Sequence, residues 1–233
     1  MKTRSGEYAQ RGDYHITLRK DWPYLPVYLE KIELAHQFIK TCSTRDLIYD
    51  MGCGEGVLVN EYRQAGYAIT GMDVNYSSEF VIQRSFLDSG LPDNSVDVLM
   101  CLDVIEHLGF ADQEKAIAEF ARVLKPGGRA LISVPNLAHL ASRLSFFFAG
   151  KLTRTSSADR HPGDRPAAEY MQLLQKYFTI RRRRGLFPTF PVISVLTVLM
   201  PARVIWLHKI YNRTLAFPNL CFLNIFYLEK KTA

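Results

Sequence analysis

The chain has 233 residues, of which 48% are hydrophobic and 22% charged, and its formal net charge at pH 7 is +6. A chain of this size buries enough apolar surface to fold without disulfides, which argues against a small disulfide-rich domain. Its four cysteines are scattered without paired spacing: Cys42, Cys53, Cys101 and Cys221. We therefore expect reduced thiols and one domain over residues 1–233.

The charge is spread unevenly. Residues 1–142 carry 14 basic and 19 acidic side chains, residues 143–184 carry 10 and 3, and residues 185–233 carry 5 and 1. An acidic first part and a basic last part indicate that the two parts bind different ligands. The basic part predicts attraction to an anionic acceptor or to anionic lipid headgroups.

The opening residues are polar and mixed in charge, so no secretory signal is expected. The apolar stretch over residues 186–207 is broken by Pro188, Pro191 and Pro201. Its uninterrupted part is shorter than the roughly 20 residues that a membrane-spanning helix needs. We expect a cytoplasmic protein without a membrane span.

Apolar residues at helical spacing predict a first helix within residues 23–40. The elements expected after it are a strand at 46–50, a helix over 57–66, a strand over 67–73, a strand over 96–103, a helix over 111–124 and a strand over 129–136. The segment LKPGG is expected to form a turn before the last of these strands. Strands alternating with helices are typical of a doubly wound α/β sheet.

Beyond residue 136 this alternation loosens. The elements expected there are a helical insertion with a loop over 136–170, a helix over 169–178, a strand over 179–187, an irregular proline-rich segment over 188–219 and a final strand over 221–231. Arg181–Arg184 lie in the strand over 179–187, which we expect to be a solvated sheet edge. The alternative is a basic patch that holds the acceptor.

Three glycines, Gly52, Gly54 and Gly56, separate the first strand from its helix, directly after Asp50. Glycine lets a ligand approach the backbone closely, and the N–H groups at a helix N-terminus favour an anion. Asp73, seventeen residues after Gly56, ends the second strand, where a carboxylate accepts hydrogen bonds from a ribose. This pattern predicts an adenosine-containing ligand, with a purely structural turn as the alternative.

The segment DMGCGEG over 50–56 departs from the GxGxxG dinucleotide pattern and resembles the first motif of class I S-adenosylmethionine-dependent methyltransferases. The resemblance continues through GMDVN, DVIEHL, RVLKPGG and LISVPN, and so covers about residues 45–136. It is greatest to the methyltransferase type 11-like, small-molecule group that includes ubiquinone-pathway enzymes. It implies a Rossmann-like, doubly wound, seven-stranded sheet, mostly parallel with an antiparallel last strand.

Within one domain, the resemblance implies a cap-helix region at 1–44, a cofactor-binding core at 45–136 and acceptor-side insertions with the last two strands at 137–233. It also implies the cofactor S-adenosyl-L-methionine. The implied cofactor contacts are Asp50, Gly52, Cys53 and Gly54 at the amino-acid end, Asp73 at the ribose, Val74, Leu87 and Asp88 at the adenine, and Cys101 and Leu102 beside the sulfonium.

Methyl transfer to a hydroxyl needs a general base, whereas transfer to an amine in its free-base form does not. His107 follows the fourth strand beside the implied methyl position, so it is the first candidate base. Asp103 shares that neighbourhood, and His161 is a further candidate on the acceptor side. A helix cap at His107 and an ordinary loop histidine at His161 are the alternatives. No metal site is expected.

We expect transfer to an oxygen of a small-molecule, lipid-linked or glycan-linked acceptor. An RNA or DNA methyltransferase stays an alternative because of the charge, although no RNA-binding module is recognisable. The second alternative is a non-catalytic regulatory protein that binds S-adenosylmethionine.

Two aromatic groups also have open interpretations. Phe146–Phe148, followed by Lys151 and Arg154, could form a peripheral membrane contact, or could pack in the core or over an acceptor pocket. Aromatic residues near the N-terminus are candidates for a lid over the cofactor: Tyr14, His15, Trp22 and Tyr24.

Overall fold

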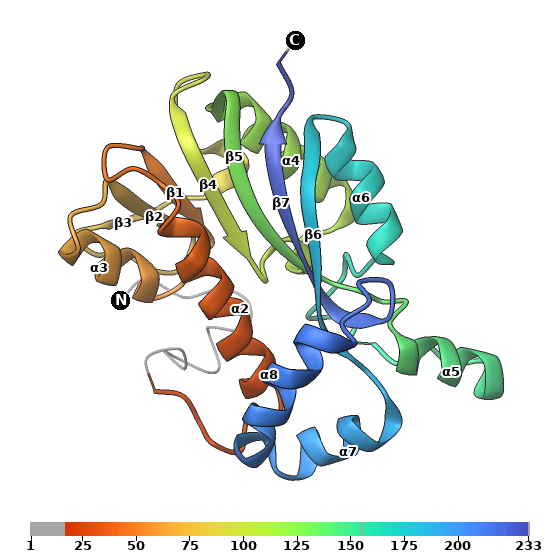
Figure 1. Cartoon of the computed structure of the whole chain (residues 1–233). Coiled ribbons are helices and arrows are strands. Elements are labelled where there is room, and N and C mark those ends of the chain that lie inside the picture. Colours follow the sequence, from red (N-terminus) through yellow and green to blue (C-terminus); the bar gives the residue numbers. More distant parts are fainter. Residues whose placement is uncertain (1–16, 155, 233) are drawn as a thin grey trace.

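A seven-stranded sheet organises the computed structural model, which describes residues 17–154 and 156–232 (Figure 1). Tyr14 and His15 lie outside the described residues. The strands are β1 (Ile48–Met51), β2 (Ile69–Asp73), β3 (Val81–Gln83), β4 (Val96–Leu102), β5 (Leu124–Pro135), β6 (Phe178–Pro188) and β7 (Cys221–Lys230). Their order across the sheet is β3-β2-β1-β4-β5-β7-β6.

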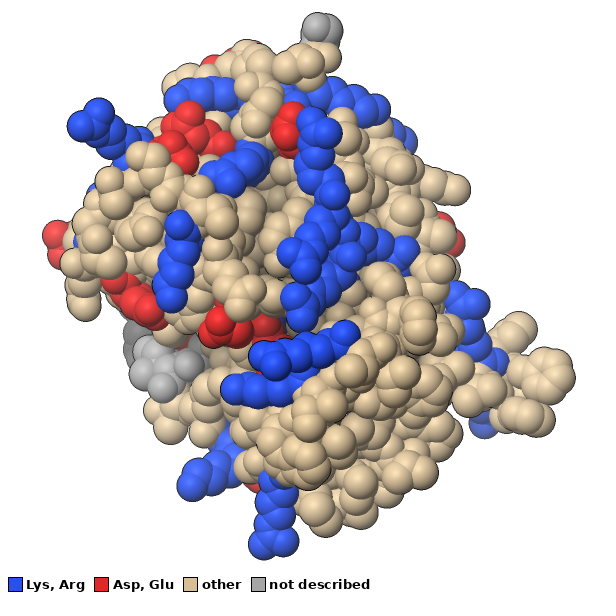
Figure 2. Space-filling view, viewed as in Figure 1, with Lys and Arg blue, Asp and Glu red and all other residues tan. Residues whose placement is uncertain are grey.

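Strands β1 to β5 pair in parallel, whereas β7 runs antiparallel to both of its neighbours, β5 and β6. This arrangement confirms the predicted mostly parallel α/β sheet with an antiparallel last strand. It also places β6, with Arg181–Arg184, at the edge of the sheet, as predicted. Figure 2 shows basic side chains gathered in a band where β6 lies.

Helices cover both faces of the sheet (Figure 1). They are α2 (Leu25–Ile39), α3 (Val57–Gln64), α4 (Phe110–Val123), α5 (Leu140–Ala149), α6 (Ala167–Gln175), α7 (Pro191–Leu199) and α8 (Ile205–Thr214), with short 3-10 helices η1 (Phe86–Asp88), η2 (Ile105–His107) and η3 (Pro201–Val204). Because side chains alternate along a strand, β4 sends Leu99 and Cys101 into the core beneath α4 and α6. It sends Val98 and Met100 into the core beneath α2 and α3.

The expectation of an irregular segment over 188–219 is wrong, because α7, η3 and α8 occupy most of it. Two of its prolines begin helices instead of breaking them. Pro191 lies in the first turn of α7 and Pro201 in the first turn of η3, where the missing N–H has no intrahelical partner to lose.

The segment LKPGG also differs from the expected turn, since β5 is continuous from Leu124. The pairing with β4 shifts register between Val96 and Val98, and Gly127 has a φ of +73°. A bulge-like irregularity therefore joins α4 to β5. No helix in the described part of the chain is long and apolar enough to cross a membrane.

Substitution of Phe120 in α4 tests the core beneath α4 and α6. Phe120→Ala is expected to lower the free energy of unfolding by about 3–5 kcal/mol, because Phe120 is fully buried and its removal leaves a cavity. Phe110→Ala in the same helix is the control, since Phe110 is largely exposed. Denaturant unfolding measures both, and equal losses would contradict this description of the core.

Candidate active site

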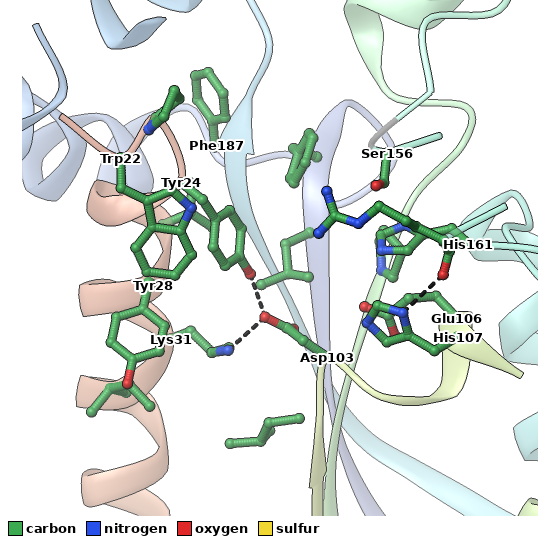
Figure 3. A pocket seen from close by; sticks show the side chains of 18 of the residues that line it. Trp22, Tyr24, Tyr28, Lys31, Asp103, Glu106, His107, Ser156, His161 and Phe187 are labelled. Carbon is green, nitrogen blue, oxygen red and sulfur yellow. Dashed lines mark hydrogen bonds and ion pairs between the residues drawn. The ribbon is translucent and has the colours of Figure 1, made fainter. Parts of the chain in front are cut away.

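A cavity of about 590 Å³ lies at the carboxyl ends of β1 and β4, where ligands of open α/β sheets bind (Figure 3). The glycine turn and the first turns of α2 form one side. The other side is formed by η2 after β4, by residues of the 153–161 loop and by residues of α7. The lining includes Tyr24, Lys31, Asp50, Gly52, Cys53, Leu102, Asp103, Glu106, His107, His139, Arg154, Arg160 and His161.

A buried ion pair joins α2 to the end of β4 (Figure 3). The Nζ of Lys31, which is 4% exposed, lies 2.5 Å from Oδ2 of Asp103, and the hydroxyl of Tyr24 donates to the same oxygen at 2.6 Å. The hydroxyl of Ser133 donates to Oδ1 at 2.5 Å. Burial alone would raise the pKa of Asp103, but Lys31, Ser133 and Tyr24 outweigh it and hold that pKa below its usual value.

The backbone is strained at two residues that face the cavity. Asp103 and Phe187 each have a φ of +57°, a left-handed conformation that side-chain-bearing residues rarely adopt. Hydrogen bonds hold both, since the amide of Asp103 donates to Ser133 Oγ and that of Phe187 to Asn212 Oδ1. Such strain is typical of functional sites.

Three groups that titrate meet on the opposite side of the cavity from Lys31. The ligand atoms of Glu106, His107 and His161 lie within 4.8 Å of one another, and the two imidazoles stack edge to face. Nδ1 of His107 lies 2.9 Å from the carbonyl of Arg160, which can only accept, so Nδ1 carries the proton. In the neutral form of this ring, Nε2 is then the nitrogen that can accept a proton.

Glu106 is the buried member of this cluster. Among the described residues its Oε2 has no hydrogen-bond partner. Burial, followed by the charge of Asp103, raises the pKa of Glu106 well above its usual value. No metal site was predicted, yet this is the one group of described residues whose spacing could hold a metal ion.

The buried amide of Gln113 in α4 holds this cluster in place. Its Nε2 donates to the carbonyls of Ile105, Leu108 and Gly163, and its Oε1 accepts from Arg165. One side chain therefore ties η2, which carries His107, to the loop that carries His161.

The carboxyl of Asp50 has an unusual protonation state. Burial raises its pKa to about 7, although the nearby Lys31 ammonium lowers it. Since Asp50 lines the cavity at the glycine turn, a bound cation would lower that pKa again.

The cavity brings together part of the predicted cofactor set. Asp50, Gly52, Cys53 and Leu102 line it, as do all three catalytic candidates, Asp103, His107 and His161. The other predicted cofactor residues lie outside the lining: Gly54, Asp73, Val74, Leu87, Asp88 and Cys101. The side chain of Cys101 packs in the core beneath α4 and α6, because it points to the face of β4 that is turned away from the cavity.

Asp73 has a structural duty at the glycine turn. Its Oδ2 accepts from the amide of Gly54 at 2.9 Å, and its Oδ1 accepts from the amide of Asn75 at 2.7 Å. Gly52 must be glycine there, because it has a φ of +77° and a Cβ would lie 2.5 Å from Val104.

Sequence reasoning missed two residues of the site. Lys31 interrupts the apolar face of the first helix, one turn from Tyr28 and Ala35, and that interruption was the available signal. His139 lines the cavity, contacts Thr189 and Thr153 and caps α5. Its partners are up to 50 residues away, so no local pattern marks it.

Residues 49–132 match a family model described as "Methyltransferase domain". They run from β1 into β5 and include the glycine turn and Asp103. This segment is therefore similar to a methyltransferase domain, and curated relatives that match the chain are named S-adenosylmethionine-dependent methyltransferases. The acidic lining at the turn fits the ammonium of the cofactor's amino-acid end.

Two curated proteins illustrate the relationship. A "probable S-adenosylmethionine-dependent methyltransferase" of Mycolicibacterium smegmatis is 34% identical over 113 residues, covering 44% of this chain and 41% of that protein. A ubiquinone biosynthesis O-methyltransferase of Paracidovorax citrulli is 30% identical over 105 residues, covering 38% of this chain and 43% of that protein. The chain thus matches about two fifths of the length of these relatives.

Solved structures share the fold across nearly the whole chain. The crystal structure of a SAM dependent methyltransferase from Archaeoglobus fulgidus has a TM-score of 0.59 at 17% identity, and covers 94% of this chain and 100% of its own. A [4+2]-cyclase, SpnF, has a TM-score of 0.55 at 18% identity and covers 84% of this chain and 80% of its own. At these identities the likeness shows the fold alone.

Asp50→Asn tests the raised pKa. Between about pH 4 and pH 7 the folded protein binds a proton at Asp50 that the unfolded chain releases, so wild-type stability falls as the pH rises through this window. The asparagine variant lacks this loss, and its stability relative to wild type is expected to rise by up to about 4 kcal/mol by pH 7 and then to stay level. Urea unfolding across this pH range measures it, and a constant difference would contradict the assignment.

The Lys31–Asp103 pair is testable by a double-mutant cycle. Lys31→Met alone leaves the buried carboxylate unpaired and is expected to cost about 3–5 kcal/mol of stability. Asp103→Asn added to it is expected to recover part of that loss. If the loss of stability in the double variant equals the sum of the losses in the two single variants, the two residues are not coupled.

Proposed function

We propose that the protein is an S-adenosylmethionine-dependent methyltransferase that transfers a methyl group to an oxygen of a small-molecule, lipid-linked or glycan-linked acceptor. One observation carries the proposal: a single cavity is lined by the glycine turn at one end and by His107, with its basic Nε2, at the other. The proposed cofactor site and a candidate general base therefore share one cavity.

The glycine turn has the chemistry to hold the cofactor's amino-acid end. The cofactor, when bound, supplies a methyl group on a cationic sulfonium. The carboxylate of Asp50 would pair with its ammonium, while the backbone at Gly52 and Cys53 leaves room for close approach. Asp103 already pairs with Lys31, so its charge at the end of β4 is neutralised and its side chain is held in place.

The base is needed because a neutral hydroxyl is a weak nucleophile. His107 Nε2 would accept the acceptor's proton as the methyl group moves to its oxygen. The carbonyl of Arg160 fixes the ring orientation, and His161 packs against the ring. In this proposal His161 is a positioning residue.

Basic groups on the acceptor side support an anionic acceptor. Arg154 and Arg160 line the cavity, and both come from the segment in which basic residues outnumber acidic ones by 10 to 3. Transfer to oxygen is supported by the ubiquinone biosynthesis O-methyltransferases among the relatives, at 30% identity or less.

Calorimetry with S-adenosylmethionine tests the binding half of the proposal. Wild type is expected to bind one equivalent, and Asp50→Ala to weaken binding by roughly 10- to 100-fold through loss of a charged contact. Glu61→Ala, an exposed acid outside the cavity, is the matched control and is expected to bind as wild type does. No binding by wild type would overturn the proposed function.

Turnover tests the catalytic half. His107→Gln is expected to keep cofactor binding while lowering the rate of methyl transfer by roughly 10²- to 10⁴-fold. His36→Gln, at a histidine outside the cavity, is the control. Phenolic, sugar and carboxylic acceptors would be screened by release of S-adenosylhomocysteine. Binding without any turnover would favour the regulatory alternative.

A further inference from the structure

Three helices near one end of the sheet expose apolar side chains to an unusual extent. Helices α5, α7 and α8 lie beyond the same end of β6 and β7, at the bottom of the view in Figure 1. We call their exposed apolar residues the apolar face: Phe146, Phe147, Phe148, Val192, Val195, Val198, Leu199, Trp206 and Ile210. Large apolar side chains exposed in this number indicate an interaction surface.

Helix α5 does not use its aromatic residues to pack against the protein. Among its ten residues only Ser142 is buried. Phe147 and Phe148 are each 80% exposed, and their rings contact each other edge to face. The sequence left open whether these phenylalanines lie in the core, and the structure places them in solvent.

Helices α7 and α8 bury polar side chains beside apolar ones and leave several large apolar side chains exposed. In α8 the buried residues are polar, His208 and Asn212, whereas Trp206 is 63% exposed and Ile210 lies on the outer side. In α7 Thr197 is buried, with its hydroxyl at 2.9 Å from His208 Nε2. A helix that buries polar groups and exposes a tryptophan is built to contact something apolar outside the protein.

The charge around the apolar face has one sign. The exposed basic residues of these segments are Arg143, Lys151, Arg203, Lys209 and Arg213. No acidic residue occurs over 137–158 or 185–228. Figure 2 shows the lower part of the molecule mainly tan, with blue side chains across it.

We propose that the apolar face docks the protein onto an anionic lipid bilayer. Apolar and aromatic side chains beside cations are the composition of an interfacial, non-spanning membrane contact, in which tryptophan favours the headgroup level. A second copy of this chain fits less well, because a two-fold contact through this face would bring the cations of both copies together.

Docking in this way would also place the cavity near the bilayer. Thr153 and Arg154 follow α5, and Ser194 and Val198 belong to α7, and all four line the cavity. The docked surface is therefore continuous with the proposed acceptor side. The docking itself does not depend on methyl transfer.

Sedimentation with liposomes tests the proposal on the full chain. Wild type is expected to pellet with vesicles of three parts phosphatidylcholine and one part phosphatidylglycerol, and much less with phosphatidylcholine alone. The double variant Phe147→Ser/Phe148→Ser is expected to lose most of that binding, at least about tenfold. The double variant Lys209→Glu/Arg213→Glu is expected to lose it for anionic vesicles, since each cation near the surface contributes roughly fivefold.

Matched substitutions elsewhere are the controls. Ile82→Ser, at an exposed apolar residue of β3, and the double variant Arg45→Glu/Lys115→Glu are expected to bind vesicles as wild type does. Unchanged thermal unfolding shows that each variant is folded. The proposal would be overturned if the wild-type protein did not bind anionic vesicles. It would also be overturned if the protein formed a dimer that Phe147→Ser/Phe148→Ser abolished.

Discussion

The buried ion pair between Lys31 and Asp103 is the constraint on which the rest of the site depends. It fixes the first helix across the end of β4, over the glycine turn. Its ammonium opposes the burial that raises the pKa of Asp50, and the charge of Asp103 helps to raise that of Glu106. Four ionisable groups from two halves of the cavity are thereby linked through one contact.

The molecule divides its chemistry between the two parts of the chain. The first part builds the parallel strands, the glycine turn and the acids that suit a cationic cofactor. The later part adds the basic loop that lines the acceptor side and the helices that carry the apolar face. In the proposed function, the cofactor binds on the side built by the first part and the anionic or lipid-linked acceptor on the side built by the later part.

The local sequence pattern was sufficient to predict a helix or strand where that element buries one regular face. The helix over 25–39, the strands of the core and the edge position of Arg181–Arg184 all follow from periodicity and chain order. It was insufficient over 188–219, where α7 and α8 bury polar side chains beside apolar ones and leave other apolar side chains exposed, so no regular apolar face marks either helix. The prolines in this segment were interpreted as helix breakers. The sequence alone does not show that a proline lies in the first turn of a helix, where it is tolerated.

The sequence by itself determined the class of fold, the glycine turn, the acids at the ends of β1, β2 and β4, and His107 as the histidine after β4. Only the tertiary structure decided which of these side chains share a cavity. Strand alternation turned Cys101 into the core, and long-range contacts brought Lys31 to Asp103 and His161 to His107. Contacts between residues 50 or more positions apart depend on how the whole sheet assembles, and no local pattern encodes them.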